Sequence, residues 1–262
     1  ALICEGPAEL GLTEAGDDAR QIRLTRQPKP PAEPIALAAT DTILVTGGAK
    51  GVTAAVVREL AAAGPAHFVL LGRSPEPGIE EPWLVGVEDD ATIKRRLMEH
   101  GGLRSPRELG AAARRVRGAR EIRATIAAVQ AAGATVEYRS CDVRDTAGLS
   151  ALIEDIEASR GPISGFVHGA GVLADRLIAD KTPEDLDFVL GTKLDALPAL
   201  LERLEGLRLL LMFSSSTARF GRRGQSDYAI ANEALNGLVA QALTRREGLR
   251  AISACWGPWA GG

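Results

Sequence analysis

The sequence predicts an α/β protein built on a parallel β-sheet that helices cover on both faces. From Asp41 onward, short apolar runs of β-type composition alternate with longer segments of helical character. Strands buried on both faces give continuous apolar runs, and the helical segments are long enough to cross over between parallel strands. The 262 residues, 45% of them hydrophobic, provide ample core material for one such domain.

Six segments are predicted to be the strands of that sheet. Each is a short run dominated by aliphatic, β-branched or aromatic side chains. The expected strands are residues 43–46, 67–71, 135–139, 163–168, 207–213 and 251–256.

Helix signals lie between the strands. An Ala-rich helix is expected over about residues 52–63. SPRE at residues 105–108 has the sequence of a capping box with proline at the first helical position, and TPED at 182–185 is a near relative of it. Gly133 is the expected stop of the helix that begins at SPRE.

The first 40 residues have a different composition from the rest. Residues 1–27 are acidic and only weakly periodic, and PKPPAEP at 28–34 predicts an extended linker, because proline fixes φ and lacks an amide hydrogen. Residues 41–262 are then the α/β domain. The sequence ends at Gly261-Gly262, soon after the last expected strand, so we expect the element that closes the fold to be missing.

A long insertion at about residues 74–132 separates the second and third strands, and its later part is rich in arginine. These arginines form either the solvated face of a helix, which the pattern favours, or a docking surface for an acidic partner. They are Arg104, Arg107, Arg114, Arg115, Arg117, Arg120 and Arg123.

Charge, cysteine usage and hydropathy exclude several classes of protein. The 31 Lys and Arg against 34 Asp and Glu give a net charge of −3, which offers no general attraction to nucleic acid or to an anionic membrane. Cys4, Cys141 and Cys255 are far apart and odd in number, so neither a disulfide framework nor a metal site is expected. No apolar run approaches the roughly 18 residues of a membrane helix, and the first residues do not show the charged-then-apolar pattern expected of a signal sequence. We therefore expect a cytoplasmic protein.

The first strand leads directly into TGGAKGVT, residues 46–53, and then into the Ala-rich helix. Glycines in this turn let the backbone bend sharply and approach a pyrophosphate, while the helix N-terminus offers free N–H groups and the positive end of its dipole. Thr53 stands where a third glycine is often found, and a purely structural glycine turn is the alternative. The residues expected at a cofactor are Thr46, Gly47, Gly48, Lys50, Gly51 and Val52.

Arg73 and Ser74 follow the second strand, where a site that prefers NAD usually carries an acid for the ribose 2′-hydroxyl. A guanidinium pairs with a phosphate through parallel hydrogen bonds, and a hydroxyl adds one more. The pair therefore predicts a 2′-phosphate and hence NADPH, with an exposed surface arginine as the alternative. Two later strand-end turns are also expected at the cofactor: Cys141, Asp142 and Val143 at its adenine end, and Gly169, Ala170 and Gly171 through close backbone approach.

Four residues from three later segments form a candidate reducing site: Ser215, Tyr228, Asn232 and Lys193. Tyr228 and Asn232 are i, i+4 and share one helix face. A carbonyl that accepts a hydride develops negative charge on oxygen and needs a proton, for which a phenol and a second hydroxyl are suitable donors. Because the reference pKa of tyrosine is about 10, a nearby cation is needed, and Lys193 on the preceding expected helix is the candidate. Asn232 is expected to order that lysine or a water that relays protons.

Eight short motifs occur in order along the chain: TGGAKGVT (46–53), GRS (72–74), CDV (141–143), HGAG (168–171), TKLDAL (192–197), FSSS (213–216), YAIAN (228–232) and WGPW (256–259). With them, residues 42–259 resemble the short-chain dehydrogenase/reductase superfamily, and within it the ketoreductase domains of polyketide and fatty acid synthases. Ordinary members of the superfamily have lysine four residues after the tyrosine. Synthase ketoreductases place asparagine there and the lysine on an earlier helix, and Asn232 and Lys193 show that exchange.

The resemblance implies a Rossmann-like, doubly wound fold and an NADPH-dependent β-ketoacyl reductase. In that scheme Tyr228 donates the proton, Ser215 polarises the carbonyl, Lys193 and Asn232 maintain the acid, and Pro258 joins the cofactor site. The implied substrate is a 3-oxoacyl thioester on an acyl carrier protein domain. Other domains of a homodimeric synthase are the further implied partners.

The resemblance also bears on the flanking and inserted segments. Residues 1–40 are similar to the end of the catalytically empty structural subdomain that precedes such ketoreductases, followed by a linker. The insertion, with EEPWL at 80–84, is similar to that of polyunsaturated-fatty-acid-type and related iterative synthases.

Two positions relate to product stereochemistry in the resembled family. Leu173-Ala174-Asp175 matches a Leu-Asp-Asp stretch of the synthases that give a D-configured 3-hydroxyl, with Ala174 as a departure. Phe220 stands eight residues before Tyr228, where the opposite class has tryptophan. The resemblance therefore implies the D product.

Two alternatives to a working synthase ketoreductase remain open. One is a catalytically inactive domain that binds the cofactor or has only a structural role. The presence of all four candidate site residues, Ser215, Tyr228, Lys193 and Asn232, argues against it. The other is a free-standing reductase of a small alcohol or sugar, against which the exchange of Lys193 and Asn232 speaks.

Overall fold

The computed structural model describes residues 10–12, 19–21 and 36–257. The chain divides into two units, Ala1–Ile35 and Ala36–Gly262. In the first unit, β1 (Leu10–Leu12) pairs with β2 (Ala19–Gln21) in antiparallel register, a pair that the sequence pattern did not predict. The expected linker at 28–34 and the cofactor residue Pro258 lie outside the described residues.

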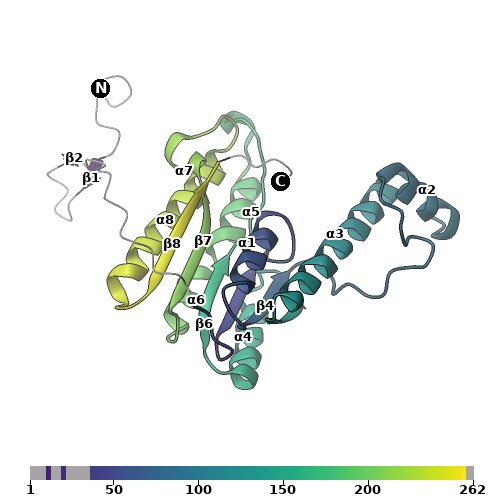
Figure 1. The fold of residues 1–262 in the computed structure, drawn as a ribbon. Coiled ribbons are helices and arrows are strands. Elements are labelled where there is room, and N and C mark those ends of the chain that lie inside the picture. Colours follow the sequence, from purple (N-terminus) through teal and green to yellow (C-terminus); the bar gives the residue numbers. More distant parts are fainter. Residues whose placement is uncertain (1–9, 13–18, 22–35, 258–262) are drawn as a thin grey trace. The chain divides into compact units, whose positions relative to one another are not determined.

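The second unit contains a six-stranded parallel sheet with the strand order β5-β4-β3-β6-β7-β8 (Figure 1). Its strands are β3 (Thr42–Thr46), β4 (His67–Gly72), β5 (Thr135–Ser140), β6 (Ile163–His168), β7 (Leu209–Ser215) and β8 (Arg250–Trp256). The predicted α/β fold with a doubly wound sheet is confirmed. The chain winds outward from β3 to β5 and then returns to β6, so the direction of winding reverses between β3 and β6.

β7 departs furthest from its expected limits, whereas the other strands agree with theirs to within one residue at each end. β7 begins two residues later than predicted and continues through Ser214 and Ser215, because its parallel register with β8 extends to the Ser215–Trp256 pair. Ser215 therefore occupies the last position of a strand and does not lie in the turn after it.

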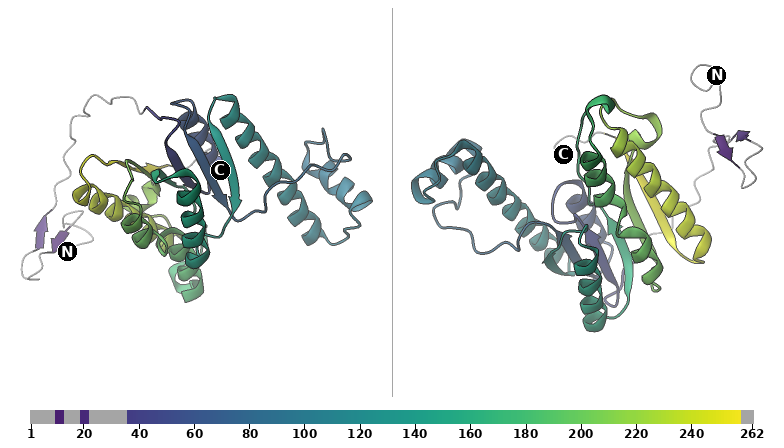
Figure 2. Two further views of the ribbon diagram at one scale, coloured as in Figure 1. Left: turned by 90° about the horizontal axis from the view of Figure 1, so that it is seen from below. Right: turned by 180° about the vertical axis from the view of Figure 1, so that it is seen from behind.

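Helices cover both faces of the sheet (Figure 2). α4 and α8 pack with α6 on one face, around an apolar core that includes Leu44, Ile153, Phe166 and Leu235. α1 and α3 contact each other on the opposite face. The helices are α1 (Gly51–Ala61), α2 (Asp90–His100), α3 (Pro106–Ala131), α4 (Thr146–Arg160), α5 (Pro183–Leu194), α6 (Leu197–Arg203), α7 (Ser216–Phe220) and α8 (Ser226–Arg245), with one 3-10 turn, η1 (Ile178–Asp180).

The two predicted capping boxes have different outcomes. At α5, Thr182 Oγ1 accepts from the Asp185 amide while the Asp185 carboxylate accepts from the Thr182 amide, so that box is complete. At α3, Ser105 is the N-cap residue, but its side chain makes no capping hydrogen bond and the predicted box is wrong. Pro183 stands at the same position of α5, so the proline does not account for the difference: the motif supplies suitable residues but does not fix the rotamer of the serine side chain. Gly133, with φ of 86°, follows the end of α3 as expected.

The insertion forms an arm in which α2 and the first half of α3 extend away from the sheet (Figure 2). A small apolar cluster of its own, including Leu84, Ile93 and Leu97, holds the two helices together. Arg120 and Arg123 both bind the Glu80 carboxylate, at N···O distances of 2.5 Å and 2.8 Å. These two arginines therefore fix the arm internally and are not part of a freely solvated face. Of the helices in the described part of the chain, none is long and apolar enough to cross a membrane.

Candidate active site

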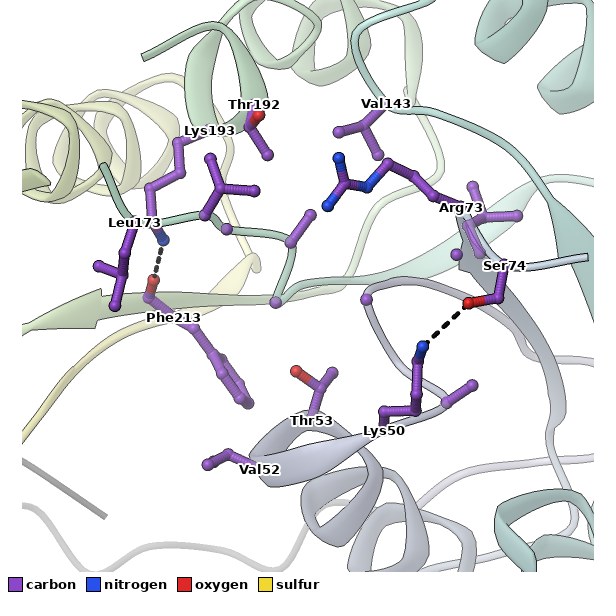
Figure 3. A pocket seen from close by; sticks show the side chains of 18 of the residues that line it. Lys50, Val52, Thr53, Arg73, Ser74, Val143, Leu173, Thr192, Lys193 and Phe213 are labelled. Atoms are coloured by element: carbon purple, nitrogen blue, oxygen red, sulfur yellow. Dashed lines mark hydrogen bonds between the residues drawn. The ribbon is translucent and has the colours of Figure 1, made fainter. Parts of the chain in front are cut away.

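A cavity of about 940 Å³ lies at the carboxyl edge of the sheet, at the reversal between β3 and β6 (Figure 3). Open α/β sheets bind their ligands at this position. The ends of β4, β3, β6 and β7 line its floor, and residues of the helices α1, α3, α5 and α8 also line it. Because neighbouring strands lie about 4.8 Å apart, these four strands span about 14 Å, which suits an extended dinucleotide.

The glycine turn after β3 lies against the turn after β6. Gly47 has a φ of 68°, and a Cβ atom there would lie 2.9 Å from the Gly169 carbonyl oxygen. A Cβ on Gly169 would in turn lie 2.2 Å from Thr53 Oγ1. The threonine in place of a third glycine is thus accommodated because Gly169 leaves room for it. Both turns present bare backbone to the cavity, as a bound pyrophosphate requires.

The residues predicted to bind a 2′-phosphate, Arg73 and Ser74, line the end of the cavity that lies next to the carboxyl end of β4. The Arg73 side chain extends across the cavity toward Val143 (Figure 3), and within the described residues its guanidinium has no hydrogen bond or ion pair. Lys50 Nζ donates to Ser74 Oγ at 2.9 Å, and Tyr138 Oη donates to the Ser74 carbonyl at 2.7 Å. The turn is therefore held in place while its arginine stays available.

The predicted cofactor residues divide into two groups. Lys50, Val52, Ser74, Cys141, Ala170 and Gly171 line the cavity together with those discussed above. Asp142, expected at the adenine end, does not line it: its Oδ1 accepts from the Arg144 amide at 3.1 Å. Thr46, Gly48 and Gly51, also predicted at the cofactor, do not line the cavity either. The sequence pattern did not single out Arg115, Thr192 and Phe213 as site residues, yet they also line it.

Lys193 projects from α5 into the other end of the cavity. It is only 3% exposed, its Nζ donates to the Phe213 carbonyl at 2.9 Å, and Nζ lies 5.6 Å from the centroid of the Tyr228 ring (Figure 3 draws the first contact). Burial lowers the pKa of Lys193 to about 8. The ammonium group thus lies beside the ring of Tyr228, and its action on that phenol stays a prediction.

Tyr228 and Ser215 line the same end of the cavity, from α8 and from the end of β7. Burial raises the pKa of Tyr228 above its usual value, and hydrogen bonding with Asn232 and Ser215 opposes that rise, while the Asp175 charge adds to it. Ser215 Oγ accepts from the Thr217 amide at 3.1 Å, which leaves the serine hydrogen free to donate.

Asn232 lies behind Tyr228 and does not line the cavity. It is fully buried, and its Nδ2 donates to the Tyr228 carbonyl at 2.7 Å. Its Oδ1 is buried and has no hydrogen-bond partner in the described part of the chain. Such an acceptor is costly unless a water or another donor reaches it.

His168 lies beneath this site, at the end of β6. Its Nδ1 and Thr46 Oγ1 are 2.8 Å apart, and burial together with the Lys193 charge lowers the pKa of His168 to about 3. The imidazole is therefore neutral near pH 7 and adds no positive charge beside Lys193.

The two residues predicted to control stereochemistry lie outside the cavity surface. Asp175 Oδ2 accepts from Gln225 Nε2 at 2.9 Å, and Phe220, at the end of α7, is 84% exposed. Their role stays a prediction. No group of three or more His, Cys, Asp and Glu in the described residues could hold a metal ion.

Residues 41–261 match the family model of the KR domain, the ketoreductase domain of synthases. The chain belongs to the KR domain family. The predicted resemblance to synthase ketoreductases with a short-chain dehydrogenase/reductase fold is therefore confirmed, and a nicotinamide dinucleotide is the cofactor class of this family.

Curated relatives of this KR domain are large synthases. It is 35% identical to a polyunsaturated fatty acid synthase of Thraustochytrium sp. over 97% of the chain and 10% of the relative. It is 31% identical to polyketide synthase GfsA of Streptomyces halstedii over 98% of the chain and 3% of the relative. The chain thus spans a tenth or less of the length of these relatives.

Solved ketoreductases have the same fold. One is PlmKR1, from the first module of phoslactomycin biosynthesis in Streptomyces sp. HK803, with a TM-score of 0.67, 29% identity, and coverage of 90% of this chain and 45% of that chain. Another is an A-type ketoreductase of a modular polyketide synthase, with a TM-score of 0.62, 30% identity, and coverage of 89% and 41%.

Proposed function

We propose that this KR domain is an NADPH-dependent 3-oxoacyl reductase that acts on thioesters of an acyl carrier protein within a larger synthase. The observation that carries the proposal is the convergence of Lys193, Ser215 and Tyr228 at one end of a cavity whose other end holds Arg73. Bound NADPH would supply the hydride to the carbonyl carbon. All proton transfer and charge stabilisation is then left to the chain's own residues.

Tyr228 is the proton donor to the carbonyl oxygen in this proposal. Its raised pKa keeps the phenol protonated at neutral pH. Ser215, whose oxygen accepts from Thr217, donates its hydrogen to the same carbonyl oxygen and polarises it. The Lys193 ammonium, 5.6 Å from the centre of the tyrosine ring, stabilises the phenolate that remains after donation.

Asn232 holds the helical turn that carries Tyr228 and supplies an acceptor for a water. Its Nδ2 is bonded to the Tyr228 carbonyl, which fixes the side chain, and its partnerless Oδ1 is a suitable site for a water that returns a proton to the phenolate. This arrangement supports the positioning role expected for Asn232.

Replacing Arg73 tests the choice of cofactor. Arg73→Ala is expected to weaken NADPH binding by about 10- to 100-fold, since a charge-assisted hydrogen bond contributes about 1.5–3 kcal/mol. NADH binding should change by less than about twofold. Arg95→Ala, an exposed arginine of α2 outside the cavity, is the control. The measurement is the dissociation constant of each cofactor by nicotinamide fluorescence, and equal losses for both cofactors would refute the 2′-phosphate assignment.

The pH dependence of the reduction rate should follow the ionisation of the Lys193 ammonium group. Because its pKa is about 8, the ammonium is present below that pH and is lost above it, and the phenolate loses its stabilising cation. We expect kcat/KM for reduction to fall as the pH rises through about 8. Lys193→Arg keeps a charge at all these pH values, so the decline should move to higher pH even if the rate is lower. A decline at the same pH in that variant would assign the ionisation to another group.

A comparison of substrates tests the proposed partner. The same 3-oxoacyl group is presented on an acyl carrier protein and on a short thioester, beside a small ketone and a sugar aldehyde. The proposal expects kcat/KM to be highest for the carrier-bound group and the product to be the D-configured 3-hydroxyacyl thioester. A preference for the small ketone or the sugar would support a free-standing reductase of small molecules instead.

A further inference from the structure

One face of α3 contacts the glycine turn that is predicted to bind the cofactor. Glu121 Oε1 accepts from the Gly51 amide at 2.6 Å, and Thr125 Oγ1 donates to the Ala49 carbonyl at 3.2 Å. These two residues are four apart and therefore lie on the same side of the helix. The helix that carries the insertion is thus fixed directly to the main chain of the cofactor turn.

Gly118 continues this face by one further turn toward the arm. It is buried, and a Cβ atom there would lie 3.2 Å from Lys50 Nζ. The lysine that binds Ser74 therefore passes directly over the helix at this position. A Cβ atom at 118 would crowd the Lys50 ammonium group, which would have to shift by a few tenths of an ångström.

Arg115 is the next residue on the same face, three positions before Gly118. Arg115 lines the cavity together with Arg73 and Ser74. In the residues that the structure describes, its guanidinium has no hydrogen bond or ion pair, whereas Arg117, Arg120 and Arg123 of the same helix are paired with carboxylates.

We propose that Arg115 binds the 2′-phosphate of the cofactor together with Arg73, so that the insertion supplies a specificity-determining residue. The inference rests on the proposed preference for NADPH. A phosphate monoester carries a charge of about −1.5 to −2 near pH 7, which one guanidinium does not balance.

The test compares Arg115→Ala with Arg114→Ala, an exposed neighbour on the same helix that does not line the cavity. Dissociation constants are measured by calorimetry for NADPH, for NADH and for adenosine 2′,5′-bisphosphate, which carries the 2′-phosphate without the nicotinamide. Arg115→Ala should weaken NADPH and the bisphosphate by about tenfold and change NADH by less than about twofold. Arg114→Ala should leave all three unchanged, and Arg115→Lys should recover part of the loss.

The outcomes separate this inference from the cofactor assignment. If Arg115→Ala leaves NADPH and the bisphosphate unchanged, or weakens NADH equally, the role of Arg115 is refuted. If the unmodified chain binds NADH as tightly as NADPH, the proposed preference for NADPH is itself refuted. In that case Arg73→Ala will also weaken the two cofactors equally. Because Arg115 is exposed, its replacement should not alter the melting temperature, and an unchanged melting temperature excludes misfolding as the cause of a loss.

Discussion

Tyr228→Phe should lower the rate of ketone reduction by about 10²- to 10⁴-fold, the usual contribution of a positioned general acid. The replacement removes one oxygen and keeps the ring 5.6 Å from Lys193, so the cavity retains its shape. No other described residue that lines this end of the cavity offers a phenol, and Ser215 is too weak an acid to replace it. The measurement is kcat for NADPH consumption with a 3-oxoacyl thioester.

NADPH binding provides the control for that variant. The phenol lies at the opposite end of the cavity from Arg73, so the dissociation constant of NADPH should change by less than about twofold. Ser215→Ala should give a smaller loss of rate, because it removes an oxygen that polarises the carbonyl and leaves the proton donor in place. Turnover that persists in Tyr228→Phe would remove this residue from the role of acid.

Lys181→Met should destabilise the fold by about 3–5 kcal/mol, the usual cost of leaving a buried charge without its partner. Lys181 Nζ lies 2.7 Å from Asp227 Oδ2, and the two side chains are only 6% and 1% exposed. Lys181 also donates to the Ala174 carbonyl, and Asp227 Oδ1 accepts from the Tyr228 amide at 2.8 Å. The pair therefore joins the segment before α5 to the first turn of α8, directly beside the proposed acid.

Chemical denaturation measures the free energy of unfolding of Lys181→Met. Two further variants show whether a loss comes from the unpaired buried charge. Lys94→Met removes one partner of the exposed Lys94–Asp90 pair, whose side chains are 42% and 36% exposed, and should cost less than about 1 kcal/mol. The double replacement Lys181→Met with Asp227→Leu removes both buried charges and should recover part of the stability. A Lys181→Met variant that unfolds like the Lys94 variant would show that this pair is not important for stability.

The fold was largely predictable from the sequence, because strands buried on both faces leave continuous apolar runs that alternate with helices. Periodicity and turn residues do not report register, so the extension of β7 through Ser215 emerged only from its pairing with Trp256. The Ser105 box failed for a related reason: its sequence fits the motif, but the sequence does not fix the rotamer of the serine side chain, which makes no capping hydrogen bond.

The candidate site was predictable to a lesser extent. Lys193, Ser215 and Tyr228 were named from residue chemistry and order along the chain, and the structure brings them to one end of the cavity. Asp175 and Phe220 were named only by resemblance, and the described residues place neither on the cavity surface. Sequence spacing gives no distance between elements, so it did not single out the Lys181–Asp227 pair or the position of Arg115.

The claim that Lys193, Ser215 and Tyr228 form a working reducing site is tested most directly by product analysis. The chain is incubated with NADPH and a 3-oxoacyl thioester, and the acyl product is identified by chromatography and mass spectrometry while NADPH is followed by absorbance. We predict that a 3-hydroxyacyl thioester appears in an amount equal to the NADPH consumed. A chain that binds NADPH, as its fluorescence would report, but forms no hydroxyacyl product would contradict the claim and identify a silent domain.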